Sequence, residues 1–196
     1  MRIAMSIMII LILNSCHNKE YRDLNLQLPQ TNIDIQKDST PGTIPAASKQ
    51  SYDLRHINTG TTTPTDFMIY ARTLMGTPYK YACSNPSVGF DCSGFLNYVF
   101  GHFNISVPRS SVDFTNIDKA IDLKDAKPGD LILFTGTDSS VRVVSHIGIV
   151  NSVENRELNF IHSSSGKAMG VTISPLSKYY LSRFVKVIRI FPQNDN

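Results

Sequence analysis

The sequence predicts an α+β fold, with N-terminal helices packed on a central antiparallel β-sheet. Two observations lead to this class: apolar residues recur at helical spacing up to about residue 103, and short apolar runs typical of strands follow after residue 130. Because the helices precede the strands instead of alternating with them, an antiparallel sheet is favoured. The 196 residues are 41% hydrophobic, which is enough for one domain with a buried core.

Two helices are predicted at the start of this domain. The first rests on apolar residues at helical spacing, namely Phe67, Met68, Ala71, Leu74 and Met75. It ends at Gly76, and a loop rich in Gly, Pro and Ser extends from there to Asp91. The second begins around Cys92 and has its own apolar stripe, namely Phe95, Leu96, Val99, Phe100 and Phe103. Pro108–Ser111 predicts a turn and the N-cap of another short helix.

The strands are predicted from the second half of the chain. The turn Lys127–Asp130 leads into a buried strand, Leu131–Phe134. Further apolar runs predict strands at Val143–Val150, Leu158–His162, Val171–Ile173 and Phe184–Ile190, and a helical turn at Pro175–Leu181.

The pairing of two of these strands bears on function. If 147–150 and 158–161 are antiparallel neighbours joined by 151–157, pairing centred near Glu154 places His146 directly opposite His162 on one face. Two adjacent imidazoles are not expected to be charged together, and one neutral ring can orient the other.

Charge and cysteine content exclude several classes of function. The net charge is +3 without any block of Lys or Arg, so no nucleic-acid partner is indicated. Three cysteines, without a C-x-x-C pair or a close Cys/His pair, indicate neither a disulfide framework nor a metal site. No organic cofactor is implied, and oligomeric state is not readable from the sequence.

The first sixteen residues have the pattern of an export signal. Ile3–Leu13 is almost wholly apolar but shorter than the about 20 residues that span a bilayer. The ending Leu13–Cys16 resembles a bacterial lipobox, which implies a lipoprotein signal peptide over 1–15 and a lipid on Cys16. His17 after it indicates the outer membrane, facing the periplasm. The alternatives are an ordinary signal peptide cut elsewhere and a short apolar anchor.

The segment from residue 16 to residue 64 is polar and irregular. It contains several prolines and no sustained apolar period, so we interpret it as a flexible tether behind the lipidated cysteine. The alternative is that part of it, around Tyr52–Ile57, packs on the domain as an arm.

Cys92, His146 and His162 together have the composition of a thiol nucleophile, its base and an orienting group. At the start of a helix, unpaired N–H groups and the positive dipole end favour a thiolate, so a lowered pKa is expected for Cys92. Taken singly, the cysteine could be a small core residue and each histidine a hydrogen-bonded structural residue. Their combination in the Asp-Cys-Ser-Gly frame favours catalysis.

Six short motifs occur in an order that resembles that of a known protein family. They are Gly76–Tyr81, Gly89–Phe95, Val107–Ser111, Lys127–Leu131, Ser145–Ile149 and Phe160–Ser164. The chain from Thr65 to Arg189 resembles the NlpC family of papain-like bacterial cell-wall peptidases. This resemblance implies a papain-like catalytic domain over about residues 65–192.

The resemblance also implies the role of each site residue. Cys92 matches the nucleophile, His146 the general base and His162 the polar third member of the triad. Tyr79 matches a tyrosine whose hydroxyl lies near the nucleophile. Two further matches, Asp91 and Ser93, fall near the substrate-binding side of the cleft.

The substrate implied by the resemblance is the stem peptide of peptidoglycan. The usual bond lies between the γ-carboxyl of D-glutamate and the diamino acid, although some lipoprotein members cut cross-links. Two other functions stay open: a non-catalytic wall-binding module that kept the fold, and a thiol amidase or acyltransferase acting on another substrate.

The chain departs from the family pattern in one place. The family usually has an aromatic residue and then Gly-Gly after the tyrosine, whereas here Tyr81 is followed by Ala82 and Cys83. These residues fit only if their positions avoid positive φ. Cys83 could pair with Cys92 in an oxidising compartment, and the alternative is an unpaired, partly buried thiol.

Overall fold

The computed structural model describes residues 56–117, 119–155 and 157–195. The predicted signal peptide, the lipidation site Cys16 and the tether up to residue 55 lie outside these residues. No helix in the described ranges combines the length and the hydropathy needed to cross a bilayer.

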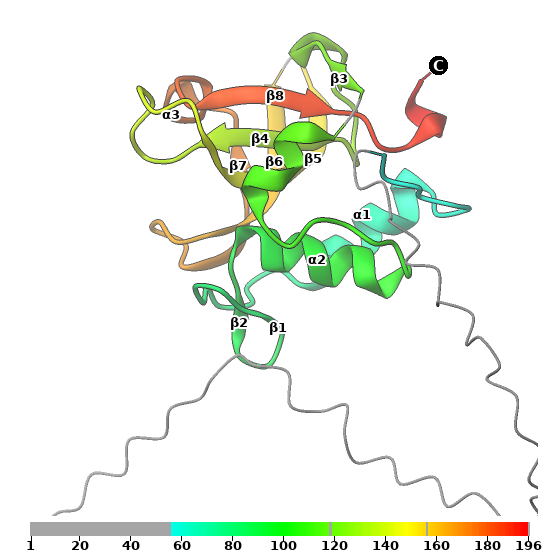
Figure 1. The fold of residues 1–196 in the computed structure, drawn as a ribbon, viewed down its shortest axis with the longest axis horizontal. Coiled ribbons are helices and arrows are strands. Elements are labelled where there is room, and N and C mark those ends of the chain that lie inside the picture. Colours follow the sequence, from blue (N-terminus) through cyan, green and yellow to red (C-terminus); the bar gives the residue numbers. More distant parts are fainter. Residues whose placement is uncertain (1–55, 118, 156, 196) are drawn as a thin grey trace, which may run out of the picture. The chain divides into compact units, whose positions relative to one another are not determined.

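A six-stranded antiparallel sheet forms the centre of the domain, with the order β3-β8-β4-β5-β6-β7 (Figure 1). Its strands are β3 (Ala120–Ile121), β4 (Leu131–Thr135), β5 (Val144–Glu154), β6 (Glu157–Ser164), β7 (Gly170–Pro175) and β8 (Phe184–Ile188). The α+β class predicted from the order of helices and strands is confirmed.

The two long helices lie in the first half of the domain. Figure 1 shows the two long helices together on one side of the sheet. The bounds are α1 (Pro64–Thr73), α2 (Cys92–His102) and α3 (Lys178–Leu181), with 3-10 turns η1 (Ser111–Asn116), η2 (Leu123–Asp125) and η3 (Pro192–Asn194). A small hairpin, β1 (Ser84–Asn85) and β2 (Gly89–Phe90), lies in the loop before α2.

The sheet is covered on both faces, and β4 shows this most clearly. Every residue of β4 is buried. Its alternate residues Leu131 and Leu133 pack in the core beneath α1 and α2, whereas Ile132 and Phe134 pack in a second core. Because strand side chains alternate between faces, a strand buried on both sides is expected to be a continuous apolar run, as Leu131–Phe134 is.

The residues before α1 also join the core. Ile57 is buried in the cluster that contains α1 and α2, and Thr59 is buried nearby in sequence. At Ile57 the chain therefore packs on the domain as an arm, which was the alternative to a flexible tether. Packing on the core begins before Thr65. Thr63 then caps α1, because its side chain accepts a hydrogen bond from the backbone N–H of Asp66 (3.1 Å).

Two expectations for the strand that bears His146 are corrected. Strand β5 continues to Glu154 instead of ending at Val150, so the connection to β6 is much shorter than predicted. The pairing places Ile149 opposite Ile161, two positions away from the register centred on Glu154. His146 and His162 are therefore diagonal neighbours rather than directly opposite. A shift of two residues keeps both side chains on the same face.

Ala82 does not meet the condition that its position avoids positive φ. Ala82 has φ +54°, in the left-handed region that costs a side chain-bearing residue roughly 1 kcal/mol. The preference of related sequences for glycine after the aromatic residue has its physical reason here, since glycine enters this region without a Cβ clash.

Replacing Ala82 by glycine tests this strain. We expect Ala82→Gly to raise the free energy of unfolding by about 0.5–1 kcal/mol, because the relieved clash exceeds the extra entropy of the unfolded chain. Denaturant unfolding measures the change. In the control Ala120→Gly, which lies in an ordinary strand, stability should fall by about the same amount. Equal destabilisation by both substitutions would contradict the strain at Ala82.

Candidate active site

Cys92 is the first residue of α2, and the residue before it fixes that start. The Asp91 side chain caps the helix by accepting a hydrogen bond from the backbone N–H of Gly94 (2.5 Å). The backbone N–H of Asp91 in turn donates to the carbonyl of Cys83 (2.9 Å). A Cβ at Gly94 would come within 2.0 Å of the Cys83 carbonyl oxygen, so only glycine allows this approach.

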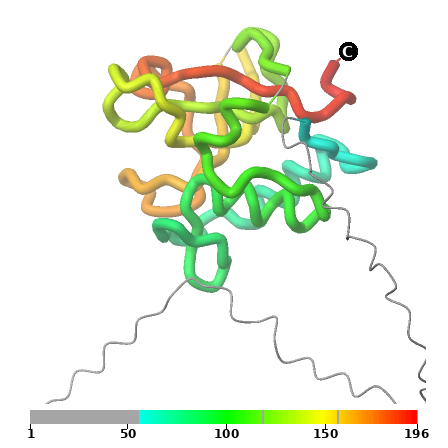
Figure 2. Tube along the Cα trace, in the orientation of Figure 1, coloured from blue at the N-terminus to red at the C-terminus, as the bar shows by residue number. Residues whose placement is uncertain are grey.

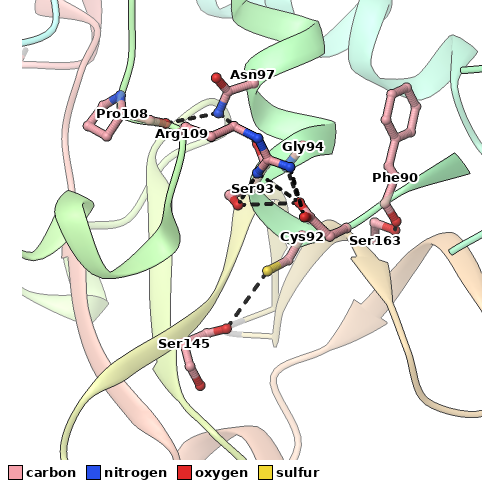
Figure 3. A network of polar contacts seen from close by, with 10 residues as sticks. Phe90, Cys92, Ser93, Gly94, Asn97, Pro108, Arg109, Ser145 and Ser163 are labelled. Carbon is pink, nitrogen blue, oxygen red and sulfur yellow. Dashed lines mark hydrogen bonds and ion pairs between the residues drawn. The ribbon is translucent and has the colours of Figure 1, made fainter. Parts of the chain in front are cut away.

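Arg109 holds the carboxylate of Asp91 in place (Figure 3). Its two terminal nitrogens donate to the two Asp91 oxygens at 3.2 and 2.9 Å, a forked ion pair. Arg109 also contacts the Ser93 hydroxyl (3.0 Å). Asp91 and Ser93 are both buried, and the structure shows Asp91 as the cap of α2 and the Ser93 hydroxyl as a partner of Asp91 and Arg109. Their substrate-binding role stays a prediction.

The thiol of Cys92 lies against the strand that carries His146. Sγ contacts the carbonyl oxygen of Ser145 at 3.8 Å, drawn in Figure 3 as a dashed line. Ser145 lies in a bulge, because Phe134 pairs with His146 while Thr135 pairs with Val144. Bulges redirect side chains and are common beside active sites. Among the described residues, the hydrogen bonds do not join Cys92 directly to His146, which is usual for a catalytic pair without substrate.

A chain of hydrogen bonds extends from His146 into the sheet. Nε2 of His146 lies 2.8 Å from Nδ1 of His162, and Nε2 of His162 lies 2.9 Å from the hydroxyl of Ser174 on β7. His162 is fully buried, whereas His146 is partly exposed. His146 thus keeps one ring nitrogen, Nδ1, for proton transfer.

Gly148 makes the contact between the two histidines possible. The register places it across from His162, and a Cβ at Gly148 would lie 3.2 Å from the Cβ of His162 and 2.8 Å from the ring of Phe160. Next to His162, the hydroxyl of Ser163 donates to the carbonyl of Phe90 (2.7 Å). This bond ties β6 to the segment that leads into the nucleophile.

The electrostatics of the thiol differ from the expectation of a lowered pKa. Burial raises the pKa of Cys92, and the negative charge of Asp91 raises it further. Backbone groups of Ser93, Ile147 and Cys92 lower it, but they do not outweigh burial and charge. The helix N-terminus favours the thiolate, but the negative charge of Asp91, the residue that caps the helix, opposes this effect on the pKa of Cys92.

Both histidines are held neutral. Burial lowers the pKa of His162 to about 4, with the charge of Arg183 as the second cause. Burial also lowers the pKa of His146 well below its usual value, helped by His162 and Arg183. Near neutral pH the site thus holds a thiol and a neutral imidazole, which is the form a general base needs.

Tyr79 is close enough to Cys92 for the two side chains to interact electrostatically. Burial and the nearby Cys92 raise the pKa of its hydroxyl, which also bonds to the side chain of Ser165. The half-buried phenol therefore stays protonated and can donate a hydrogen bond to an oxyanion that forms near Cys92.

Cys83 follows neither expectation. Cys92 carries a free thiol, so the two cysteines are not paired with each other. The Cys83 side chain is fully buried instead of partly buried. Within the described ranges, His, Cys, Asp and Glu form no group of three that could hold a metal ion.

Sequence reasoning missed two residues of the site. Ser174 follows the predicted strand 171–173, and an isolated serine there carries no signal of its partner in β6. Arg183 follows α3 and is buried, with its guanidinium bonded to the carbonyls of Thr135 and Gly136. An arginine at this place in the sequence carries no signal of its burial or of its position near the histidines.

A family model matches most of this domain. The model of the NlpC/P60 family matches residues 76–189, which contain Tyr79, Cys92, His146 and His162.

Several curated proteins are similar to this chain. The gamma-DL-glutamyl hydrolase of Bacillus subtilis is 32% identical over 120 residues, which cover 61% of this chain and 28% of that protein. The peptidoglycan endopeptidase RipB of Mycobacterium tuberculosis is 33% identical over 123 residues, 57% of this chain and 47% of that protein. A probable endopeptidase of Haemophilus influenzae is 36% identical over 118 residues, 59% of this chain and 67% of that protein. The chain thus spans less than half the length of the first two relatives.

Solved structures show the same fold. An NlpC/P60 family protein from Bacillus cereus superposes with a TM-score of 0.59 at 28% identity, covering 69% of this chain and 42% of that one. A Staphylococcus aureus protein of the same family, described as similar to a lipoprotein, gives a TM-score of 0.55 at 27% identity, covering 65% and 41%.

Alkylation of the thiol tests the electrostatics. We expect the rate of Cys92 alkylation by iodoacetamide to rise with pH and to have its inflection above about 8.5, the ordinary thiol pKa, because burial and Asp91 disfavour the thiolate. Mass spectrometry measures modification at Cys92, with Cys92→Ser as background. Asp91→Asn, which keeps a capping side chain but removes the charge, should move the inflection down. A rate already constant at pH 7 would indicate a thiolate and contradict this assignment.

Proposed function

The chain belongs to the NlpC/P60 family, and on that premise we propose that it is a cysteine endopeptidase that hydrolyses peptidoglycan stem peptides. The bond we propose is the amide between the γ-carboxyl of D-glutamate and the diamino acid. Two relatives support this choice, one named a gamma-DL-glutamyl hydrolase and one a DL-endopeptidase.

One observation supports the chemistry above all others. Cys92 begins a capped helix against the bulge next to His146, and His146 is bonded through His162 to Ser174. A wall-binding module needs neither a free thiol nor a chain of hydrogen-bonded histidines. A nucleophilic mechanism requires both a nucleophile and a base held in one orientation.

The first half of the reaction defines the histidine tautomers. His146 accepts the thiol proton at Nδ1, so its Nε2–H must donate to Nδ1 of His162. Nε2–H of His162 must then donate to the Ser174 hydroxyl. The sulfur attacks the amide carbonyl carbon, and the C–N bond breaks as His146 returns the proton to the leaving amine. A thioester on Cys92 remains.

The second half of the reaction uses the same base. Water attacks the thioester while His146 takes its proton, the C–S bond breaks, and the proton returns to the sulfur. The product acid leaves with its new carboxyl group. We assign the stabilisation of the oxyanion in both halves to the Tyr79 hydroxyl and to the backbone N–H groups at the start of α2, which the interaction of Tyr79 with Cys92 supports.

Substitutions at Ser174 test whether its hydroxyl orients His162. We expect Ser174→Ala to lower kcat about fivefold with little change in KM, because one hydrogen bond that orients His162 is lost. Ser174→Thr keeps a hydroxyl acceptor and should recover most of the rate. Steady-state kinetics on a muropeptide measures both variants. If alanine and threonine lower kcat equally, the hydroxyl has no orienting role.

Digestion of purified muropeptides tests the proposed reaction. The fragment from His56 to Asn196 should produce a new amine on the diamino acid. Cys92→Ala should produce none, because the nucleophile is absent. Mass spectrometry of the products identifies the bond. Binding to sacculi without cleavage would point to a wall-binding module, and neither binding nor cleavage would point to another acyl substrate.

We further propose that Cys16 carries a lipid that anchors the protein in the outer membrane, facing the periplasm. The run Leu13–Cys16 and the following His17 support this, together with the polar segment that can act as a tether. The similarity to a Staphylococcus aureus protein described as similar to a lipoprotein agrees with it.

Metabolic labelling tests the anchor. The full chain, expressed in a bacterium that processes lipoproteins and fed an alkyne fatty acid, should become labelled. Cys16→Ser should abolish labelling because the acceptor sulfur is gone, whereas Cys92→Ser should keep it. Labelling that survives Cys16→Ser would place the lipid elsewhere.

A further inference from the structure

Arg183 is a buried cation that no described carboxylate balances. It lies between α3 and β8 and is 7% exposed, and the ion pairs of the described residues all join other side chains. Taking a charge out of water without a counter-ion is costly, so a fold that keeps such a charge has to satisfy it with other groups. The groups around Arg183 belong to the part of the sheet next to the candidate active site.

The guanidinium of Arg183 holds the end of β4. Its Nε donates to the carbonyl of Gly136 (2.7 Å), and one terminal nitrogen donates to the carbonyl of Thr135 (2.8 Å). The backbone carbonyl of Arg183 accepts a hydrogen bond from the N–H of Thr135 (2.8 Å). Figure 2 shows the start of β8 beside the end of β4, in agreement with their pairing. Arg183 therefore fixes this strand end through both its side chain and its backbone.

The strand end held by Arg183 lies opposite the bulge next to His146. Ser145 is the extra residue of that bulge, and a Cβ at Gly136 would lie 3.0 Å from its hydroxyl. The carbonyl of Ser145 contacts the sulfur of Cys92 (3.8 Å). Arg183 thus supports, from the neighbouring strand, the backbone that presents the base beside the nucleophile.

The charge of Arg183 reaches the histidines across the aromatic rings of α3. Its guanidinium carbon lies 4.9 Å from the ring centre of Tyr179, whose hydroxyl accepts a hydrogen bond from it (2.7 Å). The same carbon lies 5.9 Å from the ring centre of Tyr180, and that ring meets His162 edge-on, with 5.7 Å between the ring centres. Burial is the main cause of the low pKa of His146 and His162, and the charge of Arg183 lowers both further.

The charges around His146 leave that of Arg183 without opposition. The other titratable groups there are Cys92 on α2, His162 on β6, Tyr179 and Tyr180 on α3, and Lys167 in the β6–β7 loop. Lys167 is exposed, so water and salt screen its charge. None of these groups is a carboxylate that would favour a proton on the imidazole.

We propose that Arg183 is a positioning residue of the reaction proposed above: its fork holds the end of β4 behind the bulge that presents His146, and its charge keeps His146 free to accept the thiol proton. The inference rests on the proposed function and adds the group that determines how far into acid the base remains usable. Its described hydrogen bonds go to neither histidine, so Arg183 acts through the strand end and through the electric field of its charge.

Two substitutions separate the fork from the charge. Arg183→Lys keeps the charge but loses the planar fork, whereas Arg183→Gln keeps an amide donor but loses the charge. On a muropeptide, Arg183→Lys should lower kcat about tenfold with little change in KM, because His146 is held less firmly. The acidic limb of its profile of kcat/KM against pH should stay at the wild-type position. In Arg183→Gln that limb should move up by about one pH unit, because His146 becomes protonated more easily.

A titration without substrate tests the charge independently of activity. In the inactive Cys92→Ala protein, the ring protons of His146 and His162 are followed by NMR against pH. Adding Arg183→Gln should move both titrations upward, whereas adding Arg183→Lys should leave them in place. The control is Arg142→Gln, because Arg142 is an exposed arginine that donates to the carbonyl of Phe184 (2.6 Å) on the same segment. It should change neither the titrations nor the pH profile.

The outcomes distinguish this proposal from the proposed function. Histidine titrations that are the same in Arg183→Gln and in the wild type would overturn the role of the charge. If Arg183→Gln does not fold, Arg183→Lys still decides, because a wild-type kcat in that variant would overturn the positioning role. Failure of the wild-type protein to cleave any muropeptide would overturn the proposed function, and the NMR titration would still show whether Arg183 controls the histidines.

Discussion

The carboxylate of Asp91 is the group on which the active site depends. It caps α2, accepts a forked ion pair from Arg109, and belongs to the residue whose backbone N–H bonds to Cys83. These contacts determine where α2 begins, and therefore where the sulfur of Cys92 lies. The same charge raises the pKa of Cys92 and Tyr79. The contacts of Asp91 thus fix the position of the Cys92 thiol, while its negative charge lowers the fraction of that thiol present as thiolate.

The neutral histidines complement this arrangement. A thiol with a raised pKa needs a base that stays unprotonated, and burial together with Arg183 keeps His146 and His162 in that form. Cys92 and His146 are therefore matched as a neutral pair, and in the proposed reaction their charges separate only as the oxyanion of the substrate develops. Arg183 lowers the pKa of both histidines and also lines a pocket beside His146, although its described hydrogen bonds go to neither histidine.

Local patterns in the sequence were sufficient for the fold class and for the elements that carry the site. The start of α2 at Cys92 and the strands bearing both histidines followed from periodicity and turn residues. The exact pairing did not, because the bulge near Ser145 and the short β5–β6 turn depend on contacts between distant residues. For the same reason the positive φ of Ala82 and the burial of Arg183 could not be predicted: both arise from packing, not from neighbours along the chain.

The loop between β6 and β7 differs from the strands of the sheet in how many amino-acid substitutions it can tolerate. Ser165, Gly166, Lys167 and Ala168 are all exposed, whereas β4 is buried throughout and His162 is fully enclosed. Exposed substitutions usually alter stability by less than about 0.5 kcal/mol, while buried ones cost far more. This short loop can therefore accumulate substitutions at little cost in stability, whereas selection for stability removes most substitutions in the buried strands.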